Sequence, residues 1–277
     1  MAAQSSLTRY ARRDSARIEG WFSRIDAEIF RALLEAQNAA GLTGAVAEIG
    51  VHHGKSFLPL CLALQEGERA LCIDLFDRQD QNVDASGHGD REIFLGHLTA
   101  FGVDLSRIDI VAGSSLDLSA LDILQKVGRV RFFSVDGGHW RDLVENDLDL
   151  AAATLTERGI VALDDFLHKE WPEVTIGGID WLRKVQGVLE PFALSDGKLY
   201  LAPAEVAKIY AMALLADPFL ARQFNKNIDL LGLKIPLLNG ADKKPLDKLN
   251  DWTRYEFPRA YNALRHIKRA VFGKADQ

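Results

Sequence analysis

The sequence predicts an α/β fold in which a doubly wound, mostly parallel sheet lies between two layers of helices. Between Ala45 and Pro203, short apolar runs alternate with helical patterns, as in parallel sheets covered on both faces. The last two runs flank Asp196-Gly197, a pair typical of a tight antiparallel hairpin. We expect three parts: an N-terminal helical segment (1–44), the main domain (45–203) and a C-terminal helical extension (204–277).

Each element follows from its periodicity. Apolar residues recur at helical spacing from Ser15 to Gln37, and Gly41 ends that pattern. After Pro203 the chain has helical character to its terminus, with interruptions near Asp217-Pro218 and at 233–240. The expected strands are 45–50, 70–76, 107–113, 130–136 and 159–166, followed by the hairpin strands 188–194 and 198–202. The helices between them are expected at 55–65, 91–101, 117–126, 140–155 and 178–186.

Composition excludes several classes of protein. The 33 Lys and Arg against 39 Asp and Glu give a net charge of −6, which argues against nucleic acid as the main partner. Cys61 and Cys72 lie inside apolar runs, as free thiols of a reducing compartment do. The arginine-rich N-terminus is followed by no apolar signal segment, and no run is long enough to cross a bilayer. We therefore expect a cytoplasmic protein whose oligomeric state, monomeric or homo-oligomeric, stays open.

The segment AEIGVHHGKS (47–56) is a strand, a glycine turn and a helix start, an arrangement that brings free backbone N–H groups close to a ligand. It is not a P-loop, because Gly50 precedes Gly54 by only three intervening residues. It is not a dinucleotide fingerprint, because His52 occupies the position of the second glycine. An acid before the turn, Glu48, suits a ligand that carries a positive charge.

A second acid, Asp74, ends the next strand 24 residues after Gly50 (74 − 50). A carboxylate at this position can accept hydrogen bonds from both hydroxyls of a ribose. The third strand ends near Ser114, where an adenine ring would lie. The candidate nucleoside-binding residues are thus Glu48, Gly50, Gly54, Ser56, Asp74 and Ser114, with Asp136 added from the fourth strand. The plain alternative is a tight strand-to-helix turn without a ligand.

Three more acids end the fourth and fifth strands. Asp136 stands in SVDGGHW, and Asp164 and Asp165 stand in LDDF, 28 residues later (164 − 136). Carboxyl ends of parallel strands meet at one edge of the sheet, so these side chains should converge there. Crowded carboxylates raise one another's pKa unless a cation lies among them. Oxygen ligands at a partly open site suit Mg²⁺, or alternatively Ca²⁺ or Mn²⁺.

These motifs resemble the class I S-adenosylmethionine-dependent methyltransferases, whose Rossmann-like sheet has five parallel strands and a final hairpin. The acid four residues before Trp140 and the later acidic pair are most similar to the metal-dependent O-methyltransferases of the macrocin type. The resemblance covers about residues 45–202 and implies methyl transfer to a hydroxyl of a small molecule, such as a sugar or a glycosylated natural product. It also implies that Asp136, Asp164 and Asp165 bind metal, with Asp136 and His139 as the catalytic residues and His139 as the base.

Other interpretations stay open at this point. Asp136 and Asp165 are also placed to cap the helices that follow them. A metal-independent methyltransferase that uses His139 alone, or a non-catalytic nucleotide-binding protein, would show the same cofactor motif. His52 and His53 lie in the glycine turn, whereas His168 and Trp171 are candidates for the acceptor pocket.

Two polar stretches complete the prediction. Residues 78–90 contain almost no apolar side chain and are a candidate lid over the site. Between Trp252 and Phe272, aromatic residues alternate with arginine and lysine. We expect a helix that packs on the main domain or on a partner subunit there, in preference to one that rests on a membrane surface.

Overall fold

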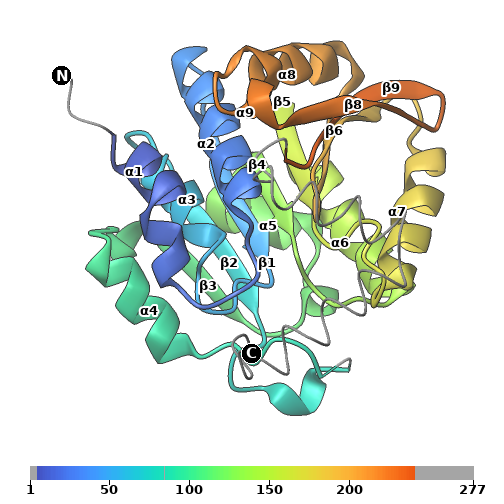
Figure 1. The fold of residues 1–277 in the computed structure, drawn as a ribbon. Coiled ribbons are helices and arrows are strands. Elements are labelled where there is room, and N and C mark those ends of the chain that lie inside the picture. The colour runs from blue at the N-terminus through green and yellow to red at the C-terminus, as the bar shows by residue number, and fades with distance from the viewer. Residues whose placement is uncertain (1–4, 84, 241–277) are drawn as a thin grey trace, which may run out of the picture. The chain divides into compact units, whose positions relative to one another are not determined.

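The computed structural model describes residues 5–83 and 85–240. Its helices and strands belong to one compact unit that ends at Asn239 (Figure 1). The strands are β1 Ala45–Ile49, β2 Ala70–Asp74, β3 Ile108–Ala112, β4 Val130–Val135, β5 Leu155–Leu163, β6 Leu189–Leu194, β7 Leu199–Pro203, β8 Phe224–Leu230 and β9 Leu233–Leu238. The helices are α1 Ser6–Arg12, α2 Arg24–Ala39, α3 Phe57–Leu62, α4 Arg91–Ala100, α5 Ala120–Val127, α6 Arg141–Thr154, α7 Pro172–Lys184, α8 Ala204–Ala216 and α9 Leu220–Gln223.

The strands of the described residues form one sheet in the order β3-β2-β1-β4-β5-β7-β6-β9-β8. The first five strands run parallel, and β7 pairs antiparallel with both β5 and β6. The order reverses at β1, so β2 lies on one side of it and β4 on the other. Ligands of open parallel sheets bind at the carboxyl ends of the strands beside such a reversal. This confirms the predicted three-layer α/β fold with a mostly parallel sheet and an antiparallel hairpin.

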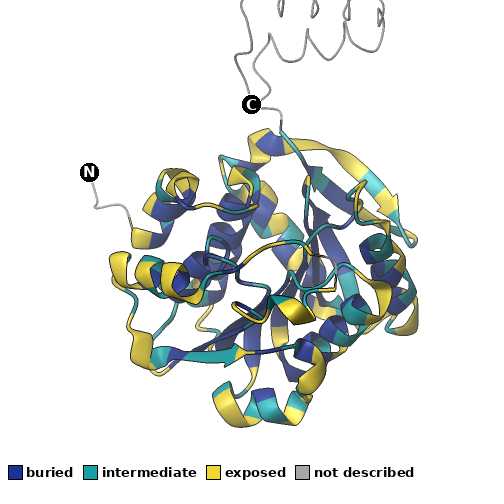
Figure 2. Ribbon diagram, turned by 90° about the horizontal axis from the view of Figure 1, so that it is seen from below, coloured by how far each residue is buried: buried dark blue, intermediate teal, exposed yellow. Residues whose placement is uncertain are grey.

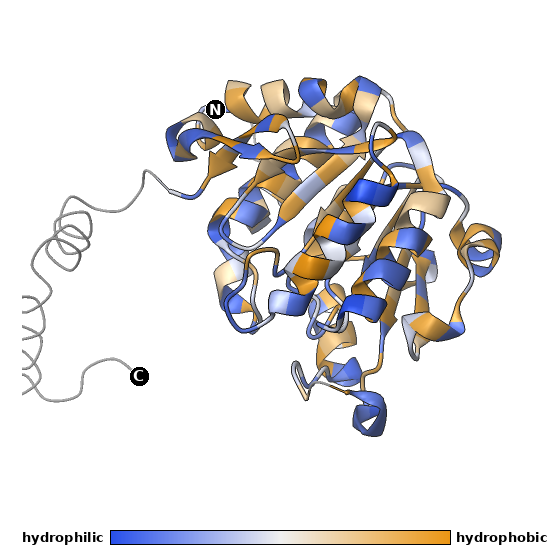
Figure 3. Cartoon of the chain, turned by 90° about the vertical axis from the view of Figure 1, so that its right-hand side faces the viewer, coloured by the Kyte–Doolittle hydropathy of each residue, from blue (hydrophilic) through white to orange (hydrophobic). Residues whose placement is uncertain are grey.

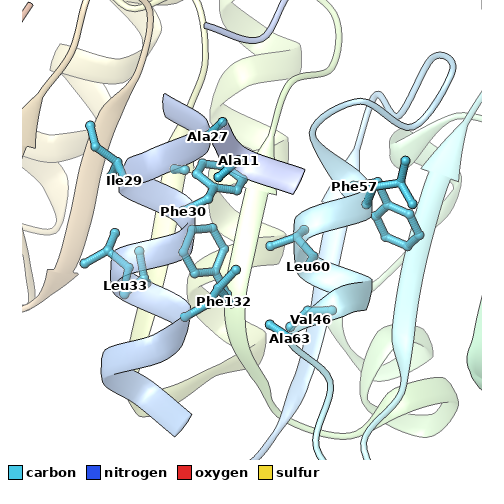
Figure 4. Close-up of a cluster of buried hydrophobic side chains, with 14 of the residues drawn as sticks. Ala11, Ala27, Ile29, Phe30, Leu33, Val46, Phe57, Leu60, Ala63 and Phe132 are labelled. Carbon is cyan, nitrogen blue, oxygen red and sulfur yellow. The ribbon is translucent and has the colours of Figure 1, made fainter. Parts of the chain in front are cut away.

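Helices cover both faces of the sheet, and each face has its own apolar core. On one face α2, α3 and α8 pack against side chains such as Val46 and Phe132. Figure 4 shows Phe30 of α2 against Phe132 of β4, with ring centroids 4.7 Å apart. On the other face α6 and α7 pack against Ala47 and Phe133. Strands β1 and β4 are therefore buried throughout, whereas the helices keep an exposed polar side (Figures 2 and 3).

The N-terminal region differs from the single helix expected from Ser15 to Gln37. It folds as α1, a short 3-10 turn and then α2, which begins only at Arg24. Ser23 caps α2 by accepting a hydrogen bond from the N–H of Asp26, and Gly20 has a φ of 132° that no helix permits. The apolar spacing continues across this break because Ile18 and Phe22 are buried without being helical. The prediction of one continuous helix was wrong.

The chain after Pro203 also differs from the expected run of helices. Helices α8 and α9 form as expected, but β8 and β9 make an antiparallel hairpin whose second strand pairs with β6. Leu231 and Gly232 connect the two strands with φ values of 49° and 82°, the left-handed conformations of a tight hairpin turn. The helical prediction was therefore wrong for residues 224–232, whereas β9 lies within the interruption expected at 233–240. The amphipathic segment expected between Trp252 and Phe272 lies outside the described residues.

Smaller boundary shifts have local causes. β5 begins at Leu155, earlier than expected, and α7 begins at Pro172, whose fixed φ suits the first turn of a helix. In the part of the chain that the structure describes, no helix combines the length and apolarity that a membrane span requires.

Candidate functional site

A cavity of about 910 Å³ lies at the carboxyl edge of the sheet. Residues at the ends of β1 to β5 line it, together with the β6–β7 turn. Two further segments close it from outside the sheet: residues 20–23 before α2, and residues from 79 to 87 after β2. Its volume is in the range that holds a cofactor together with a small substrate. Most of the site residues expected from the sequence do lie in this one cavity.

The glycine turn after β1 is shaped first by packing. A Cβ on Gly50 would lie 1.7 Å from the carbonyl oxygen of Asp136, so only glycine lets the ends of β1 and β4 approach this closely. A Cβ on Gly54 would lie 3.0 Å from the ring of Phe94, and Gly54 does not line the cavity. Gly50, His52 and Gly54 all have positive φ values, of 80°, 47° and 84°. The turn thus brings Gly50 and His52 to the cavity wall.

Asp74 lies on the cavity wall at the end of β2. Its Oδ2 accepts a hydrogen bond from the N–H of His52 (2.8 Å), and its Oδ1 accepts one from the N–H of Phe76 (2.7 Å). Burial raises the pKa of this carboxyl, and the backbone N–H groups act in the opposite direction. Each oxygen has a further lone pair, so the group can also accept hydrogen bonds from a ligand. Ser114 also lines the cavity, after β3.

Glu48 is fully buried below the cavity and does not line it. Its Oε1 accepts a hydrogen bond from the hydroxyl of Ser134 at 2.8 Å. Burial raises the pKa of Glu48 to about 7, although Lys198 and the hydroxyls of Ser134 and Ser56 lower it. Ser56 does line the cavity. Any influence of Glu48 on a ligand therefore passes through groups such as Ser56 that lie between them.

Asp136, Asp164 and Asp165 converge as expected, with one oxygen of each within 4.8 Å of the others. A cation that was not expected from the sequence, the ammonium of Lys198, lies among them. The Nζ of Lys198 is 2.8 Å from Asp164 Oδ2 and 3.4 Å from Asp136 Oδ2. Burial, reinforced by the neighbouring carboxylate of Asp136, raises the pKa of Asp164 well above its usual range. Burial also raises the pKa of Asp136, and the positive charge of Lys198 acts in the opposite direction.

His139 lies beside this cluster in a defined orientation. Its Nε2 is 3.0 Å from Asp165 Oδ2, and its ring stacks on the indole of Trp171 at 4.1 Å between centroids and 13° between planes. Its Nδ1 is 3.3 Å from the hydroxyl of Ser86 in the loop after β2. Asp165 has a φ of 53°, a strained conformation for a residue with a side chain. The arrangement pairs an imidazole with a carboxylate that fixes it.

The other residues named from the sequence are divided between cavity and core. His52, His168 and Trp171 line the cavity, whereas His53 does not. Burial lowers the pKa of His52. Asp136 and Asp165 both lie on the cavity wall and contact Lys198 and His139 respectively, so capping alone does not describe them.

Comparisons with known proteins agree with this geometry. A model of the methyltransferase-domain family matches residues 47–166.

The matched segment is similar to a methyltransferase domain.

Solved structures share its fold. The O-methyltransferase NovP is 13% identical with a TM-score of 0.56, over 71% of this chain and 88% of its own. The O-methyltransferase TomG from Streptomyces achromogenes, in complex with S-adenosylmethionine, is 18% identical with a TM-score of 0.50, over 73% and 90% of the two chains. The O-methyltransferase from Bacillus cereus, in complex with S-adenosylhomocysteine, is 13% identical with a TM-score of 0.50, over 73% and 92%. No curated protein matches the sequence. The prediction of a methyltransferase is confirmed.

The cavity includes residues on both sides of the matched segment. Trp21, Phe22 and Asp26 come from the N-terminal region, and Lys198 comes from the hairpin turn. The sequence analysis assigned none of them to the site. Lys198 shares one face of the hairpin with Tyr200 and Ala202, but Leu199 and Leu201 on the other face are buried as well. Alternation along this strand therefore does not reveal that a lysine is buried here. Trp21 was not assigned to the site because it was expected to lie on the apolar face of one continuous helix.

Proposed function

We propose that the protein transfers the methyl group of S-adenosylmethionine to a hydroxyl oxygen of a small molecule, such as a sugar or another polyol. The observation that carries this proposal is one cavity with two chemically different ends. Asp74 and the glycine turn lie at one end, and the pair of His139 and Asp165 lies at the other. The complexes of TomG with S-adenosylmethionine and of the Bacillus cereus enzyme with S-adenosylhomocysteine support the choice of cofactor.

Asp74 and the backbone around His52 would bind the nucleoside part of the cofactor. When bound, S-adenosylmethionine supplies a methyl group on a positively charged sulfur. The remaining lone pairs of Asp74 would accept hydrogen bonds from the ribose hydroxyls, and Ser114 would lie beside the adenine. Glu48 would act from below the cavity floor, where the negative charge that it carries above its pKa of about 7 favours the positively charged methionine end.

His139 would be the base that activates the acceptor. The tautomer in which Nε2–H donates to Asp165 leaves the lone pair on Nδ1, and that nitrogen already has a hydroxyl, that of Ser86, at 3.3 Å. An acceptor hydroxyl in the same position would give its proton to Nδ1 while its oxygen attacks the methyl carbon. The bond between that carbon and sulfur breaks, and its electron pair stays on the sulfur, which becomes neutral. Positioning contributes most to such a reaction.

A divalent ion fits this site only in part. Three carboxylates with oxygens within 4.8 Å supply a suitable donor set, and this observation favours metal-assisted transfer with Asp136, Asp164 and Asp165 as ligands to Mg²⁺. However, Lys198 already contacts Asp136 and Asp164, and His139 already contacts Asp165. The second version of the function, transfer without a metal, is therefore the one that the contacts favour.

The experiment has a binding stage and a turnover stage. Calorimetric titration with S-adenosylhomocysteine, in Mg²⁺ and in EDTA, tests the cofactor. Transfer of radiolabelled methyl groups to a panel of sugars, nucleotide sugars and glycosides tests the reaction. We expect binding under both conditions and transfer that survives EDTA. Loss of transfer in EDTA with return in Mg²⁺ would establish the metal-assisted version. Tight binding of NAD in place of S-adenosylhomocysteine would refute the proposal, and binding without transfer to any acceptor would favour a non-catalytic protein.

A further inference from the structure

Lys198 is a charged side chain in a fully enclosed position. It is 1% exposed, and its Nζ lies against the carboxylates of Asp164 and Asp136 at 2.8 and 3.4 Å. A buried ammonium is costly unless carboxylates or other acceptors compensate it. Here the compensation comes from residues of the site itself, since both acids line the cavity.

Acidic groups face this ammonium from several elements. Asp26 of α2 and Glu48 of β1 lie near it, in addition to Asp136 after β4 and Asp164 after β5. The ring of Phe22 is 5.8 Å from Nζ and closes the remaining side. Lys198 therefore connects the N-terminal segment with the carboxyl ends of the central strands.

The backbone of Lys198 is fixed as firmly as its side chain. Its N–H donates to the hydroxyl of Ser195 at 2.9 Å, and its carbonyl accepts from the N–H of Ser195 at 3.0 Å. Both bonds belong to the turn between β6 and β7. The ammonium thus has little freedom to leave the acids when another cation approaches.

We propose that Lys198 is a positioning residue whose ammonium takes the place of a divalent ion between Asp136 and Asp164. This rests on the proposed function, because it explains how these acids are held beside His139 and Asp165 without a metal. A divalent ion bound through the same two oxygens would lie within a few ångströms of the ammonium and be repelled by it. Lys198 keeps the cluster from being a strong metal site.

The test measures binding of Mn²⁺ by electron paramagnetic resonance, which needs no acceptor. The wild type is compared with Lys198→Met and with Lys198→Arg, which keeps the charge. We expect weak binding by the wild type and by Lys198→Arg, and binding at least roughly tenfold tighter by Lys198→Met, since a repelling charge is removed. Equal Mn²⁺ affinity of all three proteins, or tight binding by the wild type, would overturn the proposal.

Lys198→Met leaves two acids buried without their partner, and this can prevent folding. A second comparison therefore tests the proposal in variants in which an acid is removed as well. Asp164→Asn alone is compared with Asp164→Asn combined with Lys198→Met. The double variant loses one negative and one positive charge together, so its buried charges are closer to balance than in Lys198→Met. The double variant should bind Mn²⁺ more tightly than the single one, and equal affinities would again refute the role of Lys198. Thermal melting shows whether each variant is folded. Failure of the folded wild type to bind S-adenosylhomocysteine would count against the proposed function and not against the role of Lys198.

Discussion

The α-carbon of Gly50 lies so close to the carbonyl of Asp136 that a Cβ there would be 1.7 Å from the carbonyl oxygen. This contact joins the end of β1, where the cofactor turn begins, to the end of β4, where the acid cluster begins. The two halves of the cavity are therefore set at a fixed separation by backbone alone.

Gly50→Ala should disrupt this contact. The added methyl group meets a backbone carbonyl that cannot rotate away, and the φ of 80° is also unfavourable for alanine. We expect a loss of at least about 3 kcal/mol in the free energy of unfolding, measured by urea denaturation. Gly96→Ala is the control, because Gly96 lies in α4 with nothing within 4 Å of an added Cβ. It should be neutral or stabilising, and equal losses in the two variants would contradict the argument.

Asp74→Ala should weaken the binding of S-adenosylhomocysteine. It removes two charge-assisted hydrogen bonds to the ribose, each worth about 1.5–3 kcal/mol, so the dissociation constant should rise at least roughly tenfold. Titration calorimetry measures the change. Asp229→Ala, on the exposed side of β8, should bind as the wild type does. Unchanged affinity in a folded Asp74→Ala protein would show that Asp74 does not bind the cofactor.

Glu48 should make stability depend on pH. Because burial raises its pKa from 4.5 to about 7, the folded protein keeps a proton between these values that the unfolded chain releases. Stability from this group is thus present below pH 4.5 and falls by about 3 kcal/mol as the pH rises through 7. Glu48→Gln lacks this loss, so relative to the wild type it should gain stability between pH 5 and 8. Parallel curves of unfolding free energy against pH would show that Glu48 is not the titrating group.

His139→Gln should affect turnover and leave cofactor binding unchanged. Loss of a general base lowers the rate by about 10²–10⁴-fold. The measurement uses the best acceptor from the methyl-transfer panel, with calorimetry of S-adenosylhomocysteine as the second readout. His97→Gln is the matched control, since His97 lies in α4 outside the cavity. Full turnover of His139→Gln would show that another group, such as Asp136, is the base.

The loop after β2 should respond to the cofactor. Gln79, Asn82 and Ser86 form part of the cavity wall, although their segment contains almost no apolar side chain. Hydrogen exchange at residues 79–83 and 85–90 should slow several-fold when S-adenosylhomocysteine is added, while exchange in α8 stays constant. Equal protection with and without ligand would show that this segment is a fixed wall and not a lid.

The sequence predicted the central strands well because each is a short, mostly apolar run, as is typical of strands that are covered on both faces. It placed Asp74, Asp136 and Asp164 correctly, since strand order puts the carboxyl ends of parallel strands at one edge. The prediction from sequence failed where a charged residue is buried or where a strand is exposed. Lys198 is buried although lysine usually indicates solvent, and β8 is a strand although its side chains are mostly exposed. The carboxylate partners of Lys198, Asp136 and Asp164, are far away in the chain, and β8 is a strand through its pairing with β9, so the local pattern of neither segment reveals its structure.

The hairpin of β8 and β9 has a consequence for how copies of this protein can meet. By pairing with β6, β9 moves the free side of the sheet outward to β8. That strand carries Asn225, Lys226 and Asp229 at exposed positions. Charged, hydrated edge strands are poor templates for the pairing of a further strand. In any assembly of two copies, continuation of one sheet into another across β8 should therefore be disfavoured.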